Sequence, residues 1–166
     1  LNGKVVLERN FTSSSTVSDV HSHGTHVAGT VAGTIENGGA SNGVAPQAAL
    51  LNGKVLGDDG LGQWSWIMAG INWAVDPDGN PSTDDGADVI NMSIGGPYPY
   101  NANDPMHLAI NDAISKGVVI VISAGNCGPG GSGSSQCGGY DGVTTPGNNP
   151  NAISVGAVDK LGNYAP

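Results

Sequence analysis

The chain has 166 residues, of which 38% are hydrophobic, and this length suffices for one globular domain with a buried core. It carries five Lys and Arg residues against 14 Asp and Glu residues, which gives a formal net charge of −9 at pH 7. The chain therefore lacks the clustered cations that bind nucleic-acid phosphates or an anionic membrane surface, and no segment is apolar for the length of a membrane span, so we expect neither partner.

Short apolar runs alternate along the chain with segments of helical periodicity. In chain order, we predict a strand over residues 3–7, a helix over 23–35, a strand over 48–56, a helix over 63–75, a strand over 88–92, a helix over 104–116 and strands over 118–122 and 152–158. The third helix is the best delimited, because Asp104 can cap it, Pro105 suits its first turn and Gly117 follows its end. The apolar stripe predicted for the second helix consists of Trp64, Ile67, Met68, Ile71, Ala74 and Val75.

Apolar strands that alternate with amphipathic helices indicate a parallel sheet covered on both faces. We therefore predict a three-layer α/β fold, with a mostly parallel sheet and helices on both faces, that forms one domain over residues 1–166. In such sheets, ligands bind beyond the carboxyl ends of the strands. Polar or glycine-rich segments follow three predicted strands, at residues 57–62, 91–96 and 123–126, and they mark the expected site.

The sequence HGTHVAG at residues 23–29 opens the first predicted helix. A histidine in the first turn of a helix has a fixed backbone, and beside Gly24 the ring of His23 can face an open cleft, as a general base requires. A lone histidine at such a place is more often a capping residue without a catalytic task. For His23, the surrounding sequence HGTHVAG favours the general base over the capping residue.

Eight segments resemble the subtilisin-like serine proteases, the subtilase family, and they occur in the order that the family has. They lie at residues 22–29, 43–46, 54–56, 62–66, 91–96, 123–126, 145–147 and 152–157. The resemblance implies a subtilisin-like fold and a serine endopeptidase, which hydrolyses peptide bonds of a polypeptide substrate through a Ser-His-Asp triad. A monomer is expected, and the chemistry requires no cofactor.

By this resemblance, His23 is the catalytic base and His26 its structural neighbour one turn later. Asn126 matches the asparagine whose side-chain amide donates a hydrogen bond to the oxyanion, a donor whose loss costs about 10²- to 10³-fold in turnover in a subtilisin. An extended peptide would bind between two segments by strand addition, and Trp64 and Leu56 would shape an apolar subsite. The residues of these two substrate-binding segments are Gly60, Leu61, Gly62, Ser93, Ile94, Gly95 and Gly96.

Two motifs of the family are absent from these 166 residues. One is the Asp-Ser/Thr-Gly motif that carries the catalytic acid, and the other is the Gly-Thr-Ser-Met-Ala motif that carries the nucleophile. Asp19 is too close to His23 in sequence, and lies on the wrong segment, to be that acid. We therefore expect a partial catalytic domain, truncated rather than degenerate, with the acid before Leu1 and the serine after Pro166, and we expect this chain alone to be inactive.

Cys127 and Cys137 flank a loop rich in glycine and serine. Metal binding is disfavoured, because the chain has no C-x-x-C pair or neighbouring histidine at these positions. A disulfide is favoured over two free thiols, and it points to a secreted, extracellular protein.

No metal ligand is assigned from the sequence, but a structural calcium ion is considered at one place. Asp76, Asp78 and Asn80 have the D-x-D-x-N spacing that can present oxygen atoms to calcium, although the glycine and glutamate of a complete calcium loop are missing. The alternative is a solvated acidic turn. The loop between Gly33 and Gly43 does not reproduce a typical calcium loop of the family.

Two other functions are weighed against the protease. In the first, His21, His23 and His26 have the H-x-H-x-x-H spacing of some zinc hydrolases, but the aspartate expected at Thr25 and the later histidines other than His107 are missing. The second is a non-catalytic binding module built on a degenerate protease fold, which would lack the serine motif in its natural form.

Overall fold

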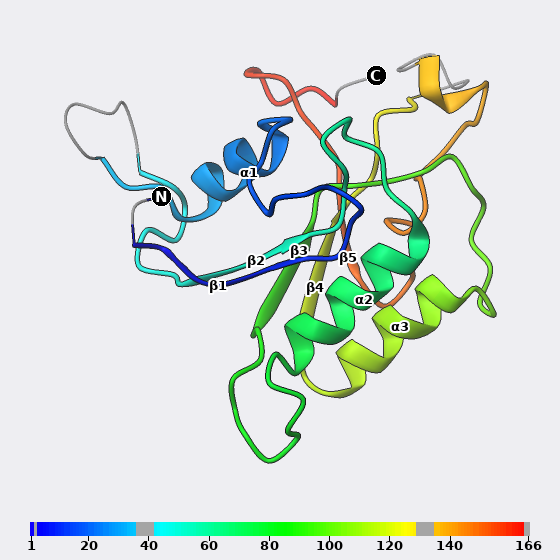
Figure 1. Cartoon of the computed structure of the whole chain (residues 1–166). Coiled ribbons are helices and arrows are strands. Elements are labelled where there is room, and N and C mark those ends of the chain that lie inside the picture. The colour runs from blue at the N-terminus through cyan, green and yellow to red at the C-terminus, as the bar shows by residue number, and fades with distance from the viewer. Residues whose placement is uncertain (2, 36–41, 129–134, 165–166) are drawn as a thin grey trace. The chain divides into compact units, whose positions relative to one another are not determined.

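The computed structural model describes residues 1, 3–35, 42–128 and 135–164 (Figure 1). The chain divides into two compact units, Leu1–Gly79 and Asn80–Pro166. Each unit contains its own parallel sheet, and each sheet packs against a helix. These features confirm the predicted α/β class with parallel strands.

The first unit contains β1 (Val5–Asn10), α1 (His23–Ala32), β2 (Leu50–Lys54) and α2 (Trp64–Val75). The strands β1 and β2 pair in parallel along their length, from Val5 opposite Leu50 to Asn10 opposite Lys54. Helix α2 packs on β2, and its apolar face is set by Ile67 and Ile71, as the stripe predicted. Trp73, which the predicted stripe omits, is also buried and packs against Phe11, with 5.8 Å between the ring centroids.

The second unit contains β3 (Val89–Met92), α3 (Pro105–Ser115), β4 (Val119–Ser123), the short 3₁₀ helix η2 (Ser135–Cys137) and β5 (Ile153–Val155). The three strands pair in parallel in the order β3-β4-β5. Helix α3 packs on β4, and most of the buried side chains of the unit are apolar, although His107, Thr144, Thr145 and Asn149 are buried with them. Its largest fully buried apolar side chains are Met106, Ile110, Ile120, Ile122 and Pro146.

The boundaries of α3 confirm the capping signals in the sequence. The carboxylate of Asp104 accepts a hydrogen bond from the Met106 N–H at 2.8 Å, and Pro105 occupies the first helical position. Gly117 follows the helix with a φ of +94°, a conformation that a residue with a side chain rarely adopts. These local signals suffice because each acts within a few residues of the helix end.

Two other boundaries differ from the prediction for reasons that lie elsewhere in the chain. Helix α1 ends at Ala32 rather than at residue 35, because the Val44 N–H donates to the Thr30 carbonyl at 3.0 Å and the Ala45 N–H donates to the Val31 carbonyl at 2.7 Å. Residues 34 and 35 would need these two carbonyls to continue the helix. The first strand runs to Asn10 rather than to residue 7, because pairing with β2 extends it past the apolar run.

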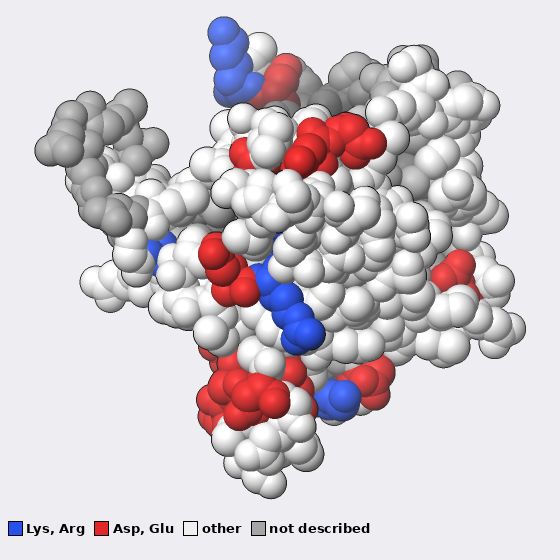
Figure 2. Space-filling model, in the orientation of Figure 1, with Lys and Arg blue, Asp and Glu red and all other residues white. Residues whose placement is uncertain are grey.

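Acidic residues dominate the charge of the chain. The basic side chains visible on the face drawn in Figure 2 are isolated from one another, and most lie beside acidic ones. Lys54 forms an ion pair with Asp58, and Lys116 forms one with Asp112 at 2.8 Å. In the part of the chain that the structure describes, no helix is long and apolar enough to cross a membrane.

His107 lies in α3 and is fully buried. Its Nδ1 atom is 3.3 Å from the Asn149 amide nitrogen, its ring centroid is 4.7 Å from that of Tyr100, and its Nε2 atom has no hydrogen-bond partner among the described residues. Burial lowers the pKa of His107 below its usual value of 6.5, although the nearby charge of Asp104 opposes this shift. The folded chain therefore holds this imidazole neutral at a pH where the unfolded chain begins to protonate it.

We expect the free energy of unfolding to fall as the pH drops below 6.5, the usual pKa of histidine. The reason is that His107 binds a proton in the unfolded chain but stays neutral in the folded chain. The difference of one proton changes the free energy of unfolding by at most about 1.4 kcal/mol per pH unit. Urea unfolding between pH 7 and pH 5 should show this loss, and His107→Gln should flatten the slope. Equal slopes in the two proteins would contradict the assignment to His107.

Candidate functional site

The amino end of α1 is held by a carboxylate from outside the helix. The residue before the helix, Ser22, has a left-handed backbone (φ 74°), and its side chain makes no capping hydrogen bond. Instead, Asp19 accepts a hydrogen bond from the Ser22 N–H on Oδ1 at 2.8 Å and one from the Thr25 N–H on Oδ2 at 2.7 Å. His23, the predicted base, lies between these two anchored residues, and its side chain is exposed.

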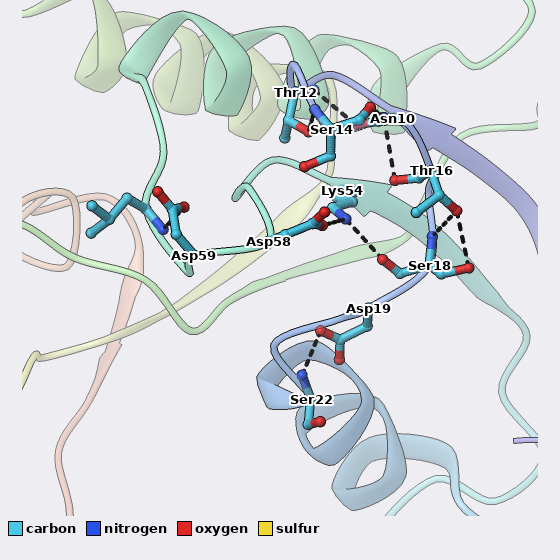
Figure 3. Close-up of polar contacts among 11 residues, drawn as sticks. Asn10, Thr12, Ser14, Thr16, Ser18, Asp19, Ser22, Lys54, Asp58 and Asp59 are labelled. Carbon is cyan, nitrogen blue, oxygen red and sulfur yellow. Dashed lines mark hydrogen bonds and ion pairs between the residues drawn. The ribbon is translucent and has the colours of Figure 1, made fainter.

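The segment that leads from β1 to this helix is fixed by polar contacts (Figure 3). The amide group of Asn10 bonds the Ser14 carbonyl at 2.7 Å, and Asn10 Oδ1 accepts from the backbone and the hydroxyl of Thr12. Lys54, whose side chain is 9% exposed, donates to the Ser18 carbonyl at 2.8 Å and forms its ion pair with Asp58. The chain therefore reaches α1 on a path fixed to β2.

A tight turn of the first predicted substrate-binding segment lies beside the start of α1. The Gly60 N–H donates to the Gly57 carbonyl at 2.9 Å, and Gly60 has a φ of +78°. A Cβ atom on Gly60 would lie 2.7 Å from His21 Nε2, so only glycine fits there without displacing the imidazole. The ring of His21 is in turn 6.4 Å from that of His23, edge to face. The structure thus brings the predicted base and the residues at 60–62 to one surface of the first unit.

This surface continues into an open cleft of 510 Å³. Leu61, which is 62% exposed, and Gly62 contribute to its wall, and Gly62 packs against Leu56. Trp66 lines the cleft, whereas Trp64, expected to shape a subsite, is not among its lining residues. The remaining lining residues are Ser13, Ser14, Gly57, Asp58, Asp59 and Gln63. Hydrogen bonding and the charge of Lys54 hold the pKa of the Asp58 carboxyl below its usual value, so this part of the wall is anionic at neutral pH.

In the second unit, two predicted site segments follow the carboxyl ends of neighbouring strands, β3 and β4. The Ser123 hydroxyl donates to the Ile94 carbonyl at 3.2 Å and so ties the segment at 93–96 to the one at 123–126. The backbone of Ala124 is fixed on two sides, because its N–H donates to Val155 at 2.8 Å and its carbonyl accepts from Thr144 at 2.9 Å. Asn126 comes directly after this fixed stretch, and its side chain is exposed.

Two threonines that the sequence analysis did not single out organise this part of the molecule. A Cβ atom on Gly95 or on Gly125 would collide with the side chain of Thr144, so both backbones approach it more closely than any other residue type allows. Thr145 forms an antiparallel bridge with Gly96, with hydrogen bonds of 2.8 and 3.0 Å in the two directions. The sequence pointed to this region only through Thr-Pro-Gly at residues 145–147, which resembles a segment of the family but indicated no role for either threonine.

Asn126 is also anchored from its other side. Its neighbour Cys127 is 2% exposed and forms a disulfide with Cys137, with 5.4 Å between the Cα atoms. The favoured pairing of the two cysteines is therefore present in the structure. Fixed residues before and after Asn126 limit the positions that its amide can take.

The structure bears differently on the calcium and zinc sites considered from the sequence. Asp76 and Asp78 offer carboxylate oxygens within 4.8 Å of each other, which is an acidic cluster of the kind that exposed loops often carry, and calcium binding there stays a prediction. Among the described residues, no three histidines bring their ring nitrogens that close together, so the zinc arrangement of His21, His23 and His26 finds no support. Residues 36–41 of the loop between Gly33 and Gly43 lie outside the described residues.

Parallel sheets, packed helices and polar segments beyond the strand ends define an α/β protein of the type that binds ligands at the carboxyl edge of its strands. A family model described as the subtilase family matches residues 7–166, and this chain belongs to that family.

Several relatives share about two fifths of their aligned residues with this chain. It is 42% identical over 147 residues to Subtilisin of Bacillus pumilus, covering 89% of this chain and 46% of the relative. It is 42% identical over 163 residues to Subtilisin DY of Bacillus licheniformis, covering 98% of this chain and 53% of the relative. It is 41% identical over 136 residues to the Major intracellular serine protease of Bacillus subtilis, covering 78% of this chain and 39% of the relative. The chain thus spans about half or less of the length of these relatives.

Proposed function

We propose that these residues are part of the catalytic domain of a serine endopeptidase, in which His23 is the general base and Asn126 is the oxyanion donor. The observation that carries this proposal is the match to the subtilase family over residues 7–166, which includes both residues. The local geometry supports it. His23 is exposed at the start of a helix whose first turn is anchored, and Asn126 is exposed on a segment anchored on both sides. Rigid placement of exposed polar groups is what general-base and oxyanion chemistry require.

In the proposed reaction, a serine hydroxyl supplied by the family's nucleophile motif attacks the peptide carbonyl carbon while His23 takes its proton. The carbonyl oxygen becomes an oxyanion, and the side-chain amide of Asn126 donates a hydrogen bond to it. His23 then gives the proton to the leaving amine, so that an acyl-enzyme remains. Water, activated by the same histidine, hydrolyses the acyl-enzyme and restores the serine.

The substrate is a polypeptide bound in extended form along residues 60–62 and 93–96. Support comes from Gly96, whose N–H and carbonyl both pair with Thr145. In an extended segment, neighbouring residues direct their backbone groups to opposite sides, so we expect the N–H and carbonyl of Gly95 to be directed away from Thr145. An added strand would bond these groups.

The setting of the enzyme is proposed from the same features. The disulfide Cys127–Cys137 favours a secreted enzyme, although two matched relatives are named as intracellular. The domain acts as a monomer and needs no cofactor for its chemistry. The proposal also includes a structural calcium ion at Asp76 and Asp78, which the catalytic chemistry does not require.

An active-site titration tests the proposal. A polypeptide that joins these residues to the family's aspartate and serine motifs should release a burst of chromophore from an activated peptide ester, in an amount equal to the enzyme. The 166-residue chain alone should show no burst and gain no mass from a fluorophosphonate, because its histidine has no nucleophile to activate. A burst from the chain alone would contradict this assignment, and no burst from the joined polypeptide would favour a binding module.

A further inference from the structure

The strongest unexplained feature outside the proposed catalytic groups is the start of α1. Among the described residues, Ser22 is the one residue other than glycine with a positive φ. A left-handed backbone costs a residue with a side chain about 1 kcal/mol or more, and such residues persist only where their surroundings fix them. The strained residue directly precedes His23.

Asp19 fixes this strained residue with both of its carboxylate oxygens. Oδ1 accepts from the Ser22 N–H and Oδ2 accepts from the Thr25 N–H, so one side chain bridges the residue before His23 and the second residue after it. The same carboxylate lies against Gly24, where a Cβ atom would be 3.6 Å from Oδ2. An asparagine could accept only one of these two hydrogen bonds, because its amide nitrogen is a donor.

The position of Asp19 is itself defined. Its neighbour Ser18 is tied to β2 through the hydrogen bond from Lys54, and the segment before it is held by the Asn10 contacts (Figure 3). A chain of contacts therefore runs from β2 through Lys54 and Ser18 to Asp19 and then to the backbone around His23. Ser18 and Asp19 are joined by a peptide bond, and the other steps are hydrogen bonds of 2.7–2.8 Å.

We propose that Asp19 is a positioning residue for His23, because its two oxygens hold the backbone on both sides of the histidine and thereby set the direction of the imidazole. The part of this proposal that concerns catalysis rests on the proposed role of His23 as base. Asp19 does not act as the triad acid, since both of its oxygens are occupied by backbone N–H groups rather than by the ring.

The protonation of Asp19 agrees with this role. Partial burial raises the pKa of the Asp19 carboxyl, but the hydrogen bonds from Thr25 and Ser22 and the nearby His21 outweigh it, so the pKa lies below its usual value of 3.8. Asp19 is consequently ionised, with both oxygens able to accept, throughout the pH range in which a histidine base works.

The first test measures positioning directly in the 166-residue chain by NMR. In Asp19→Asn, the Ser22 or the Thr25 amide should lose hydrogen-exchange protection at least about tenfold, and the couplings of His23 should change from those of one χ1 rotamer to an average. Asp19→Glu keeps both acceptor oxygens and should retain much of the order. Unchanged protection and couplings in Asp19→Asn would overturn the proposal, whatever the activity of the protein.

The second test measures catalysis in the joined polypeptide that carries all three triad residues. Asp19→Asn should lower kcat by about tenfold to a hundredfold, the range that a misplaced catalytic group costs, with KM changed less than about twofold. Asp19→Glu should recover part of kcat. A kcat within about twofold of the parent in Asp19→Asn, or an equal loss in Asp19→Glu, would overturn the catalytic part.

Asp159 provides the matched control, because it is an exposed carboxylate that also accepts backbone hydrogen bonds, from Leu161 at 2.8 Å and Asn163 at 3.0 Å. Asp159→Asn should leave kcat and the His23 couplings unchanged, and an equal loss there would mean general destabilisation and overturn the assignment to Asp19. If the joined parent polypeptide is inactive, the proposed function fails, and the NMR test still decides whether Asp19 orders His23.

Discussion

Replacing His23 with alanine, in a polypeptide that carries the complete triad, is expected to lower kcat by about 10⁶-fold. That magnitude comes from a subtilisin and is adopted here on the strength of the family match. Without an imidazole, the serine hydroxyl keeps its proton and cannot attack the carbonyl. The measurement is steady-state hydrolysis of a chromogenic peptide, with an active-site titration to count functional sites.

His26→Ala is the matched control for this variant. His26 lies one turn further along the same helix and its backbone N–H bonds the Ser22 carbonyl at 3.1 Å, a contact that the substitution preserves. We expect its kcat to change by less than about tenfold, because its ring has no assigned task in the reaction. If kcat fell by a similar factor in His23→Ala and His26→Ala, the loss would come from damage to the helix rather than from removal of the His23 ring.

Replacing Asn126 with leucine in the same polypeptide is expected to lower kcat by about 10²- to 10³-fold and to leave KM within about twofold. Leucine has nearly the shape of asparagine but offers no N–H to the oxyanion, so only an interaction made in the transition state is lost. The fixed backbone before Asn126 and the disulfide after it make a compensating shift of the segment costly. Initial rates over a range of substrate concentrations separate kcat from KM.

Asn103→Leu is the corresponding control, since Asn103 is an exposed asparagine outside all of the assigned segments. It should retain the parent kcat. A rise in KM with unchanged kcat in Asn126→Leu would instead place Asn126 in ground-state binding of the substrate, and the oxyanion assignment would be wrong.

The sequence predicted those features that depend on neighbouring residues. The caps of α3 follow from Asp104, Pro105 and Gly117, which act within one turn of the helix. The apolar face of α2 follows from its period, except for Trp73, whose burial depends on Phe11 from a distant segment. The early end of α1 depends on Val44 and Ala45 in the same way. Long-range contacts therefore account for the errors.

The site shows the same division between local and long-range information. The motif around His23 was evident from its residues and the family resemblance, whereas the role of Asp19 in holding that motif required its two hydrogen bonds to be seen. From the sequence, the place of Asp19 excludes it as the triad acid and indicates no other role. Thr144 was missed because its importance comes from Gly95 and Gly125, which are close to it in space but distant in sequence.

The disulfide between Cys127 and Cys137 bears on the redox conditions under which the proposed activity should be measured. It begins at the residue directly after Asn126, so cleavage by a thiol would release the chain next to the proposed oxyanion donor. Cytosolic glutathione keeps most such bonds open, whereas oxidising surroundings keep them closed. Catalytic competence would thus depend on the redox potential of the medium.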